Sequence, residues 1–281
     1  IIFDNRGIGE STVASYDDPI TIELMAQDTI ELIRHLEIER FNLFGRSMGG
    51  NIALCTASKI PSDLKLEKLI ICSGFARFRT DVKFSEKIEQ LYKLPKMDHP
   101  KTIQEQKDML LNREKILADY LLEHPDKFDK ISEIILKTNV NRPFEILKRQ
   151  WEAIKQSDLV SRIKEIKVPT LIIHGEVDEI VPIEEAELLS HEIPNTKLCR
   201  IPKVGHSIYI MAPDCKCRFQ LDLGQCPEIE QIYFIKAYCA DLNKNLGLNF
   251  YIDKPIKLQY LQSKRSKKAL YDLRTDHLNS D

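Results

Sequence analysis

Ser47, which lies between Gly45 and Gly49, is the best candidate in this sequence for a catalytic nucleophile. An apolar run of strand length, residues 41–44, leads into Gly45-Arg46-Ser47-Met48-Gly49, which has the pattern Gly-x-Ser-x-Gly. Residues 51–59 can form a helix, so the context is strand, tight turn and helix, as a nucleophile elbow requires. Such a turn would lift the Ser47 hydroxyl off a sheet and point the Met48 amide at a developing oxyanion.

The elements that must position this serine alternate along the chain. Apolar runs predict strands over 1–3, 41–44, 69–72, 168–175 and 196–201, and helical patterns occupy 21–36, 51–59 and 183–191. This alternation predicts an α/β fold with a mostly parallel sheet and helices on both faces. Ligands of such sheets bind beyond the carboxyl ends of the strands, and Ser47 falls at that edge.

A long segment without a strand pattern interrupts the alternation. Helices are predicted there over roughly 82–94, 102–122, 127–136 and 143–156. Because the sheet pattern resumes afterwards, we expect a helical cap inserted over the site. Trp151, the only tryptophan, is expected to anchor the core rather than to bind a ligand.

The end of the chain differs in character from the rest. The predicted division is a core of residues 1–75 and 161–212, a cap of 76–160 and a C-terminal extension of 213–281. Cys215, Cys217 and Cys226 cluster in the extension, but they lack the fourth ligand and the spacing of a zinc site, so no metal is predicted. Residues 227–245 could form a helix.

Composition limits the kinds of partner. The 281 residues carry a net charge of -2, so no overall field favours nucleic acid or an anionic membrane, and a small molecule is the expected partner. No apolar run is long enough for a membrane span. Seven scattered cysteines, an odd number, favour a reducing compartment and hence the cytoplasm. The chain opens in mid-strand with Ile1-Ile2-Phe3, which suggests a fragment.

Four motifs together resemble those of the α/β-hydrolase family. Residues 4–11 resemble its Asp-x-Arg-Gly-x-Gly-x-Ser turn, 44–50 its nucleophile elbow, 168–178 the strand that bears its catalytic acid, and 204–206 its histidine loop. The motifs follow the family's order, serine, aspartate, histidine. The resemblance covers residues 1–212 and implies an α/β-hydrolase fold whose first strands would precede residue 1.

The same resemblance implies a role for each residue of a triad. Ser47 would be the nucleophile, His206 the base and Asp178 the acid. The chemistry agrees, because a serine hydroxyl is a poor nucleophile until a base takes its proton, and a neutral imidazole can do so. The histidine in turn needs a carboxylate that fixes its tautomer.

Neighbouring residues compete with this assignment or depart from the family. Glu176 and Glu179 flank Asp178 and are expected to be solvated, whereas His174 ends the strand and is expected to support the site from behind. Arg46 stands where the family often has histidine or an uncharged residue, and the sequence indicates no partner for it.

The expected function is that of a serine hydrolase. It would cleave a carboxylic ester, lactone or related acyl bond through an acyl-enzyme, with Met48 N–H at the oxyanion and without a metal or organic cofactor. One alternative is a carbon–carbon hydrolase, haloperoxidase-like enzyme or acyltransferase on the same triad, since a fold does not decide among them. Another is a non-catalytic ligand-binding or inactive truncated homologue.

Overall fold

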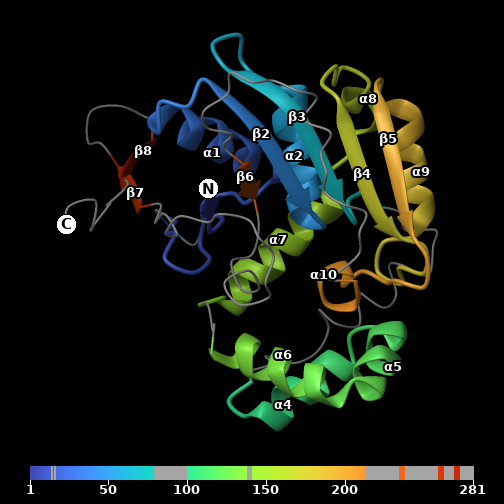
Figure 1. Ribbon diagram of the computed structural model, residues 1–281. Helices are drawn as coiled ribbons and strands as arrows, with labels where there is room; N and C mark the ends of the chain where they lie inside the picture. The colour runs from blue at the N-terminus through green and yellow to red at the C-terminus, as the bar shows by residue number, and fades with distance from the viewer. Residues whose placement is uncertain are drawn as a thin grey trace, which may run out of the picture.

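A six-stranded sheet, in which every pair of neighbouring strands is parallel, organises the chain (Figure 1). The computed structural model describes residues 1–13, 15, 17–78, 100–137 and 141–212, and the backbone of 234–237, 259–262 and 269–272. In spatial order the strands are β1 (Ile2–Phe3), β6 (Phe234–Ala237), β2 (Arg40–Arg46), β3 (Lys65–Cys72), β4 (Thr170–Gly175) and β5 (Thr196–Ile201). The predicted parallel sheet is confirmed.

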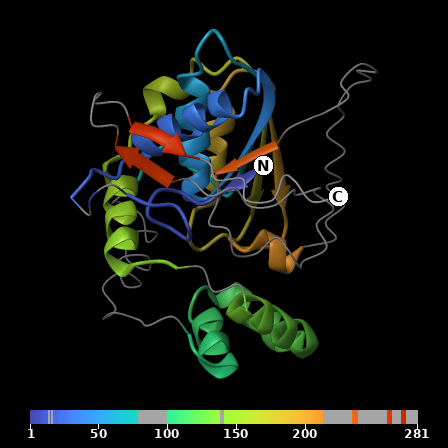
Figure 2. The same cartoon turned by 90° about the vertical axis from the view of Figure 1, so that its left-hand side faces the viewer.

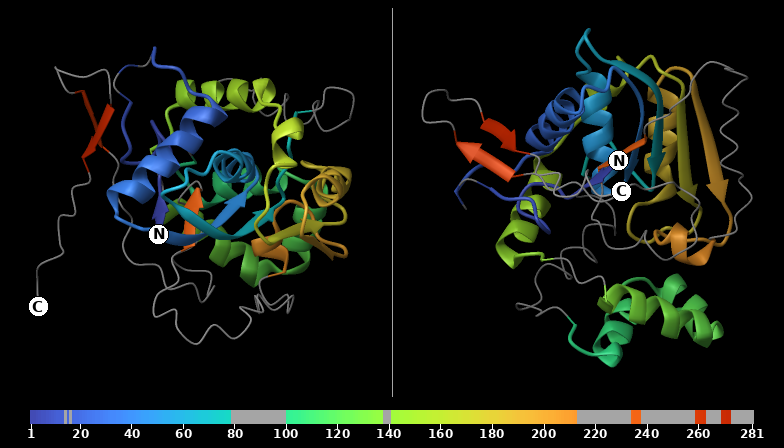
Figure 3. Two further views of the ribbon diagram at one scale, coloured as in Figure 1. Left: turned by 90° about the horizontal axis from the view of Figure 1, so that it is seen from above. Right: turned by 60° about the vertical axis from the view of Figure 1, so that its left-hand side comes forward.

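Helices pack on both faces of this sheet. They are α1 (Ile22–His35), α2 (Met48–Ser58), α8 (Val160–Ile163), α9 (Ile183–Glu192) and α10 (Ile208–Met211). Successive side chains of a strand point to opposite faces. Leu69 and Ile71 of β3 join the cluster that holds α1, α2 and α9, which line one side of the sheet in Figure 3, whereas Ile70 and Cys72 pack with Ile208 of α10.

Several helices precede α8 in the described part of the predicted insertion, residues 76–160. They are α4 (Ile103–Leu111), α5 (Lys115–Glu123), α6 (Pro125–Lys137) and α7 (Phe144–Gln156). The first three form a small core together with Ile210 of α10, and they lie beyond the carboxyl ends of β2, β4 and β5 (Figures 1 and 2). Helix α7 returns to the main core, where Trp151 is buried edge-on against Phe78.

The single helix predicted over 102–122 is wrong, because the structure has two helices there. Thr102 and Glu105 form a capping box that starts α4, and Asn112 ends it. Glu114 then adopts an extended backbone, with φ −145° and ψ 138°, before α5 begins. Tertiary contacts of the Glu114 side chain, described below, override the local helical preference. The helix predicted over 82–94 lies outside the described residues.

The C-terminal segment contributes strands. Strand β6 lies between β1 and β2 and is parallel to both, so a helix over 227–245 is wrong at residues 234–237. Both edges of β6 are hydrogen-bonded there, which satisfies its backbone groups as well as a helix would. Strands β7 (Gln259–Gln262) and β8 (Ala269–Asp272) form a separate antiparallel pair. The three clustered cysteines, 215, 217 and 226, lie outside the described residues.

No helix of the described part of the chain combines the length and apolar character that crossing a bilayer requires.

A buried ion pair ties the loop after β1 to helix α1. Arg6 donates from Nε to Asp28 Oδ2 over 2.7 Å and from Nη2 to Asp28 Oδ1 over 2.6 Å. Both side chains are only 5% exposed. Arg34 and Asp63 form a pair of the same bidentate geometry at the surface, at 2.9 and 2.8 Å. The two pairs share their geometry and differ in burial, although Arg34 also pairs with Glu31 over 3.4 Å.

We expect Asp28→Ala to destabilise the protein by about 3 to 5 kcal/mol, because it removes the carboxylate to which the buried Arg6 guanidinium donates two hydrogen bonds. Asp63→Ala should change the free energy of unfolding much less, because its partner stays in water. Urea unfolding of both variants measures the difference. Equal losses of unfolding free energy would mean that the buried Arg6–Asp28 pair contributes no more to stability than the surface pair.

Candidate active site

Ser47 occupies a strained turn between β2 and α2. Strand β2 ends at Arg46, helix α2 begins at Met48, and Ser47 between them has φ 52° and ψ −125°. A positive φ is uncommon for a residue other than glycine and costs about 1 to 3 kcal/mol, so packing must hold the turn in place. The Ser47 N–H donates to the carbonyl of Cys72 at the end of β3, over 3.0 Å.

Glycine at position 45 allows β2 and α2 to approach each other this closely. A Cβ on Gly45 would overlap the carbonyl oxygen of Gly49 and lie 2.6 Å from the Cβ of Ala53. Neither the helix backbone nor a helical alanine can move aside easily, so a side chain at Gly45 would push the turn out of shape. The close approach of strand and helix is therefore the reason for a glycine at position 45.

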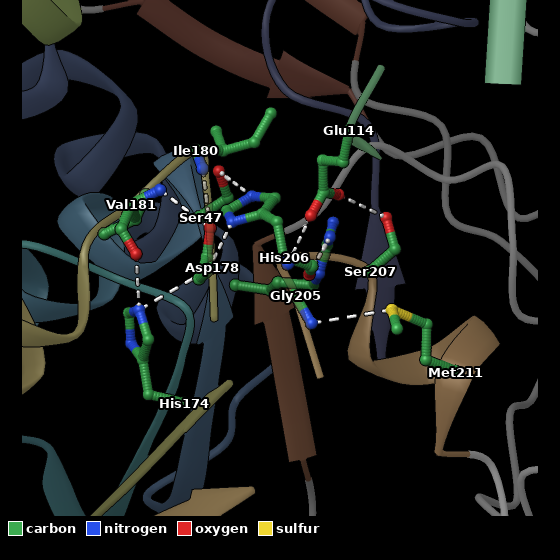
Figure 4. A network of polar contacts seen from close by, with 11 residues as sticks. Ser47, Glu114, His174, Asp178, Ile180, Val181, Gly205, His206, Ser207 and Met211 are labelled. Atoms are coloured by element: carbon green, nitrogen blue, oxygen red, sulfur yellow. Dashed lines mark hydrogen bonds and ion pairs between the residues drawn. The ribbon is translucent and has the colours of Figure 1, made fainter. Parts of the chain in front are cut away.

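The structure brings Ser47, His206 and Asp178 into one chain of hydrogen bonds (Figure 4). Ser47 Oγ lies 3.0 Å from His206 Nε2, and His206 Nδ1 lies 2.9 Å from Asp178 Oδ2. The three residues follow β2, β4 and β5, so they meet at the carboxyl edge of the sheet. Since an ionised carboxylate only accepts, Nδ1 carries the proton and Nε2 is left to accept from the serine hydroxyl.

Asp178 is held as a carboxylate. Its Oδ1 accepts the N–H groups of Ile180 and Val181, at 2.9 and 2.8 Å. Burial by itself raises the pKa of Asp178, but the charges of His206 and His174 and the hydrogen bonds to His206 and Val181 outweigh it, so the pKa lies below its ordinary value. The site therefore contains a fixed negative charge beside the imidazole of His206.

His174 supports Asp178 from the side away from His206, as expected. It is fully buried, and its Nε2 lies 2.8 Å from the carbonyl oxygen of Val181 and 3.4 Å from Asp178 Oδ2. Because a carbonyl only accepts, Nε2 carries a proton. Burial lowers the pKa of His174, which favours the neutral ring. Glu176, the competing acid, is exposed at the surface.

The backbone N–H of Met48 is the first of helix α2. Donors in the first turn of a helix have no partner within the helix, and the helix dipole makes them favourable for a negative charge. This position agrees with the predicted oxyanion contact.

Two contacts with the backbone of His206 could not be predicted from the sequence. Arg46 Nη2 donates to the carbonyl oxygen of His206 over 2.8 Å, and its guanidinium lies 4.6 Å from the ring centre of Tyr209. Glu114, from the inserted segment, accepts the His206 N–H over 2.7 Å. Arg46 could be noticed only as an unusual residue in its motif, and Glu114 lies 92 residues from His206 without any motif around it.

Within the ranges that the structure describes, no three histidine, cysteine, aspartate or glutamate side chains are grouped as ligands for a metal ion.

Comparisons with known proteins agree with this architecture. A family model described as alpha/beta hydrolase fold matches residues 1–213. AB hydrolase superfamily protein YisY of Bacillus subtilis is 30% identical over 212 residues, which are 73% of this chain and 74% of that protein. Human monoacylglycerol lipase ABHD6 is 26% identical over 228 residues, 76% of this chain, and the chain spans only 64% of its length.

Among solved structures, the chain is similar to a thermophilic esterase from Thermogutta terrifontis. The two are 27% identical, the TM-score is 0.55, and the match covers 75% of this chain and 74% of the esterase. Ser47, Asp178 and His206 all lie within the residues that the family model matches.

Proposed function

The chain belongs to the alpha/beta hydrolase fold family, and on that premise we propose that it is a serine hydrolase that cleaves a carboxylic ester, lactone or related acyl bond of a small molecule. The family and the relatives of the chain indicate that it is a hydrolytic enzyme. Our proposal concerns the type of bond that is cleaved and the roles of the catalytic residues. The observation that carries them is the hydrogen-bond chain from Ser47 through His206 to Asp178.

In the proposed reaction Ser47 Oγ attacks the acyl carbon while its proton passes to His206 Nε2. Asp178 accepts the Nδ1–H and stabilises the imidazolium that forms. The Met48 N–H donates to the oxyanion. His206 then returns the proton to the leaving alcohol, which departs and leaves an acyl group on Ser47. A water molecule, deprotonated by His206, hydrolyses this ester and restores the free serine.

We propose that residues 76–160 form a cap over this site, with residues 1–75 and 161–212 as the core. Helices α4, α5 and α6 lie beyond the carboxyl ends of the strands (Figure 1), and Ser47 directly follows the carboxyl end of β2. A cap in this place would exclude water from the acyl group and select the substrate.

The proposed partner is a small acyl substrate in a reducing compartment. Human ABHD6 is named a monoacylglycerol lipase and the Thermogutta terrifontis protein an esterase, and both names concern ester bonds. No disulfide joins Cys55, Cys72 and Cys199 to one another in the described part of the chain, and the proposed location is the cytoplasm, where thiols stay reduced.

Labelling with a fluorophosphonate tests the nucleophile. Folded protein should react covalently, and peptide mapping should locate the label on Ser47, because only an activated serine attacks the phosphorus. Absence of labelling in folded protein would reject Ser47 as the nucleophile. Labelling with little turnover of short-chain p-nitrophenyl esters would favour the carbon–carbon hydrolase alternative over an esterase.

The logarithm of kcat/KM should rise with pH with a slope of one. A general base must be neutral to accept a proton, so activity grows as His206 loses its proton. The pKa of Asp178 lies below its ordinary value, so Asp178 should not add a second proton to this step. Initial rates between about pH 5 and 8 measure the slope. A slope of two would contradict this reading of the site.

A further inference from the structure

A buried carboxylate of the cap contacts the loop that bears His206. Glu114 is 1% exposed, and its two oxygens serve two different groups of that loop. Oε2 accepts the backbone N–H of His206 over 2.7 Å, and Oε1 accepts the hydroxyl of Ser207 over 3.0 Å (Figure 4). Hydrogen bonds to an ionised acceptor are among the strongest in proteins, so this is a firm attachment.

The neighbouring residues fit the Glu114 carboxylate closely. A Cβ on Gly205 would overlap Glu114 Oε2 and lie 2.6 Å from Ile116 Cγ2, so glycine is needed for the cap to come this near. The next residue of the cap, Lys115, donates its N–H to Glu179 Oε2 over 3.1 Å. The turn between α4 and α5 is therefore attached both to the histidine loop and to the loop that bears Asp178.

The backbone of His206 is held by opposite charges on its two sides. The Glu114 carboxylate accepts its N–H, and the Arg46 guanidinium donates to its carbonyl oxygen over 2.8 Å. Arg46 belongs to the nucleophile turn and Glu114 to the cap. The negative carboxylate faces the N–H donor and the positive guanidinium faces the carbonyl acceptor. Together these two contacts fix the backbone from which the His206 imidazole extends.

We propose that Glu114 is a positioning residue: it holds the loop of His206 so that Nε2 stays within reach of Ser47, and it makes the position of the base depend on the docking of the cap. A movement of α5 away from the core would remove this contact and release the His206 N–H. The catalytic part of the proposal rests on the proposed function, whereas the attachment of the loop does not.

Three variants separate this role from general packing. Glu114→Ala removes both contacts. Glu114→Gln can keep them, because its carbonyl oxygen accepts the His206 N–H while its amide donates to Ser207 Oγ. Glu179→Gln is the matched control, since Glu179 also links the cap to the core through a backbone N–H but does not contact His206.

Hydrogen exchange of the amides in residues 204–208, read by mass spectrometry, tests the attachment without any need for activity. Exchange there should be about tenfold faster or more in Glu114→Ala and close to wild type in Glu114→Gln and Glu179→Gln. Unchanged exchange in Glu114→Ala would overturn the proposal. If wild type neither labels nor hydrolyses esters, the proposed function fails, and this measurement still decides whether Glu114 holds the loop.

Steady-state kinetics on a p-nitrophenyl ester test the consequence. In Glu114→Ala, kcat should fall by about 10- to 100-fold with KM changed less than about threefold, since a small misplacement of a base costs rate rather than binding. Glu114→Gln should recover most of the rate. A raised KM with unchanged kcat, or a Gln variant as slow as the Ala variant, would overturn the positioning role.

Gly205→Ala provides a second route if Glu114→Ala does not fold. Its Cβ would displace the Glu114 carboxylate from the other side of the same contact. The same fall in kcat and the same faster exchange at residues 204–208 are expected. Wild-type values of both in a folded Gly205→Ala protein would overturn the proposal.

Discussion

Replacing Ser47 with alanine is expected to reduce kcat for ester hydrolysis by about 10⁴-fold or more, because no other group can form the acyl-enzyme. The turn itself should survive, since the hydroxyl contacts only His206 Nε2 among the bonds described for it. Initial rates with a p-nitrophenyl ester and loss of fluorophosphonate labelling measure the effect. Folding is checked by thermal unfolding.

Ser58→Ala is the control for this change. Ser58 ends the same helix, α2, and its hydroxyl only donates to the carbonyl of Cys55 over 2.9 Å. This variant should change stability little and kcat less than about twofold, because Ser58 lies at the opposite end of α2 from Ser47. If Ser47→Ala kept more than a tenth of the wild-type rate, another nucleophile would have to be sought.

Asp178→Asn is expected to lower kcat by about 10⁴-fold with little effect on folding, as the comparable change does in a serine protease. The asparagine oxygen can keep the two N–H bonds that Oδ1 accepts from Ile180 and Val181. Its amide must then donate to His206 Nδ1, which forces the proton onto Nε2. In that tautomer His206 cannot accept the proton of Ser47.

Glu176→Gln is the matched control, because it makes the same carboxylate-to-amide change two residues earlier on an exposed side chain. It should change kcat less than about tenfold. Rates of both variants, together with their thermal unfolding, decide between the two candidates. If Glu176→Gln were the damaging change and Asp178→Asn the mild one, the acid would be misassigned and the loop after Gly175 would need reinterpretation.

The cap proposal and the triad can fail separately. A protein that labels at Ser47 but shows no rate loss in Glu114→Ala would keep its nucleophile and lose the link between the cap and the base. A protein with faster exchange at residues 204–208 in Glu114→Ala, but no labelling, would keep the link and lose the proposed chemistry.

Much of this site could be predicted because its signals are local. The apolar run before Gly45, the glycine itself and the helix after Ser47 follow one another directly, and a tight turn depends mainly on its own few residues. The parallel sheet could be predicted for the same reason, since alternation of strand and helix patterns restricts the connections to a few. The edge that gathers Ser47, Asp178 and His206 follows from that topology.

Other features depend on contacts between distant segments. The break between α4 and α5 has no strong local signal, because Asn112 and Glu114 can both be accommodated in a helix at small cost. The buried Glu114 carboxylate accepts hydrogen bonds from an N–H and a hydroxyl that lie 92 and 93 residues away. These bonds stabilise the break between the helices by more than that cost. The strand at 234–237 is similar, because its partners, β1 and β2, lie far away in sequence.

The sequence by itself determined the serine turn, the alternation of strands and helices on either side of the inserted segment, and the residues at the carboxyl edge of the sheet, because each depends on neighbours a few positions apart. Only the tertiary structure decided that Arg46 donates to the His206 carbonyl and that Glu114 accepts the His206 N–H. These contacts form between loops of separate strands and the cap, so the spacing of residues along the chain does not reveal them.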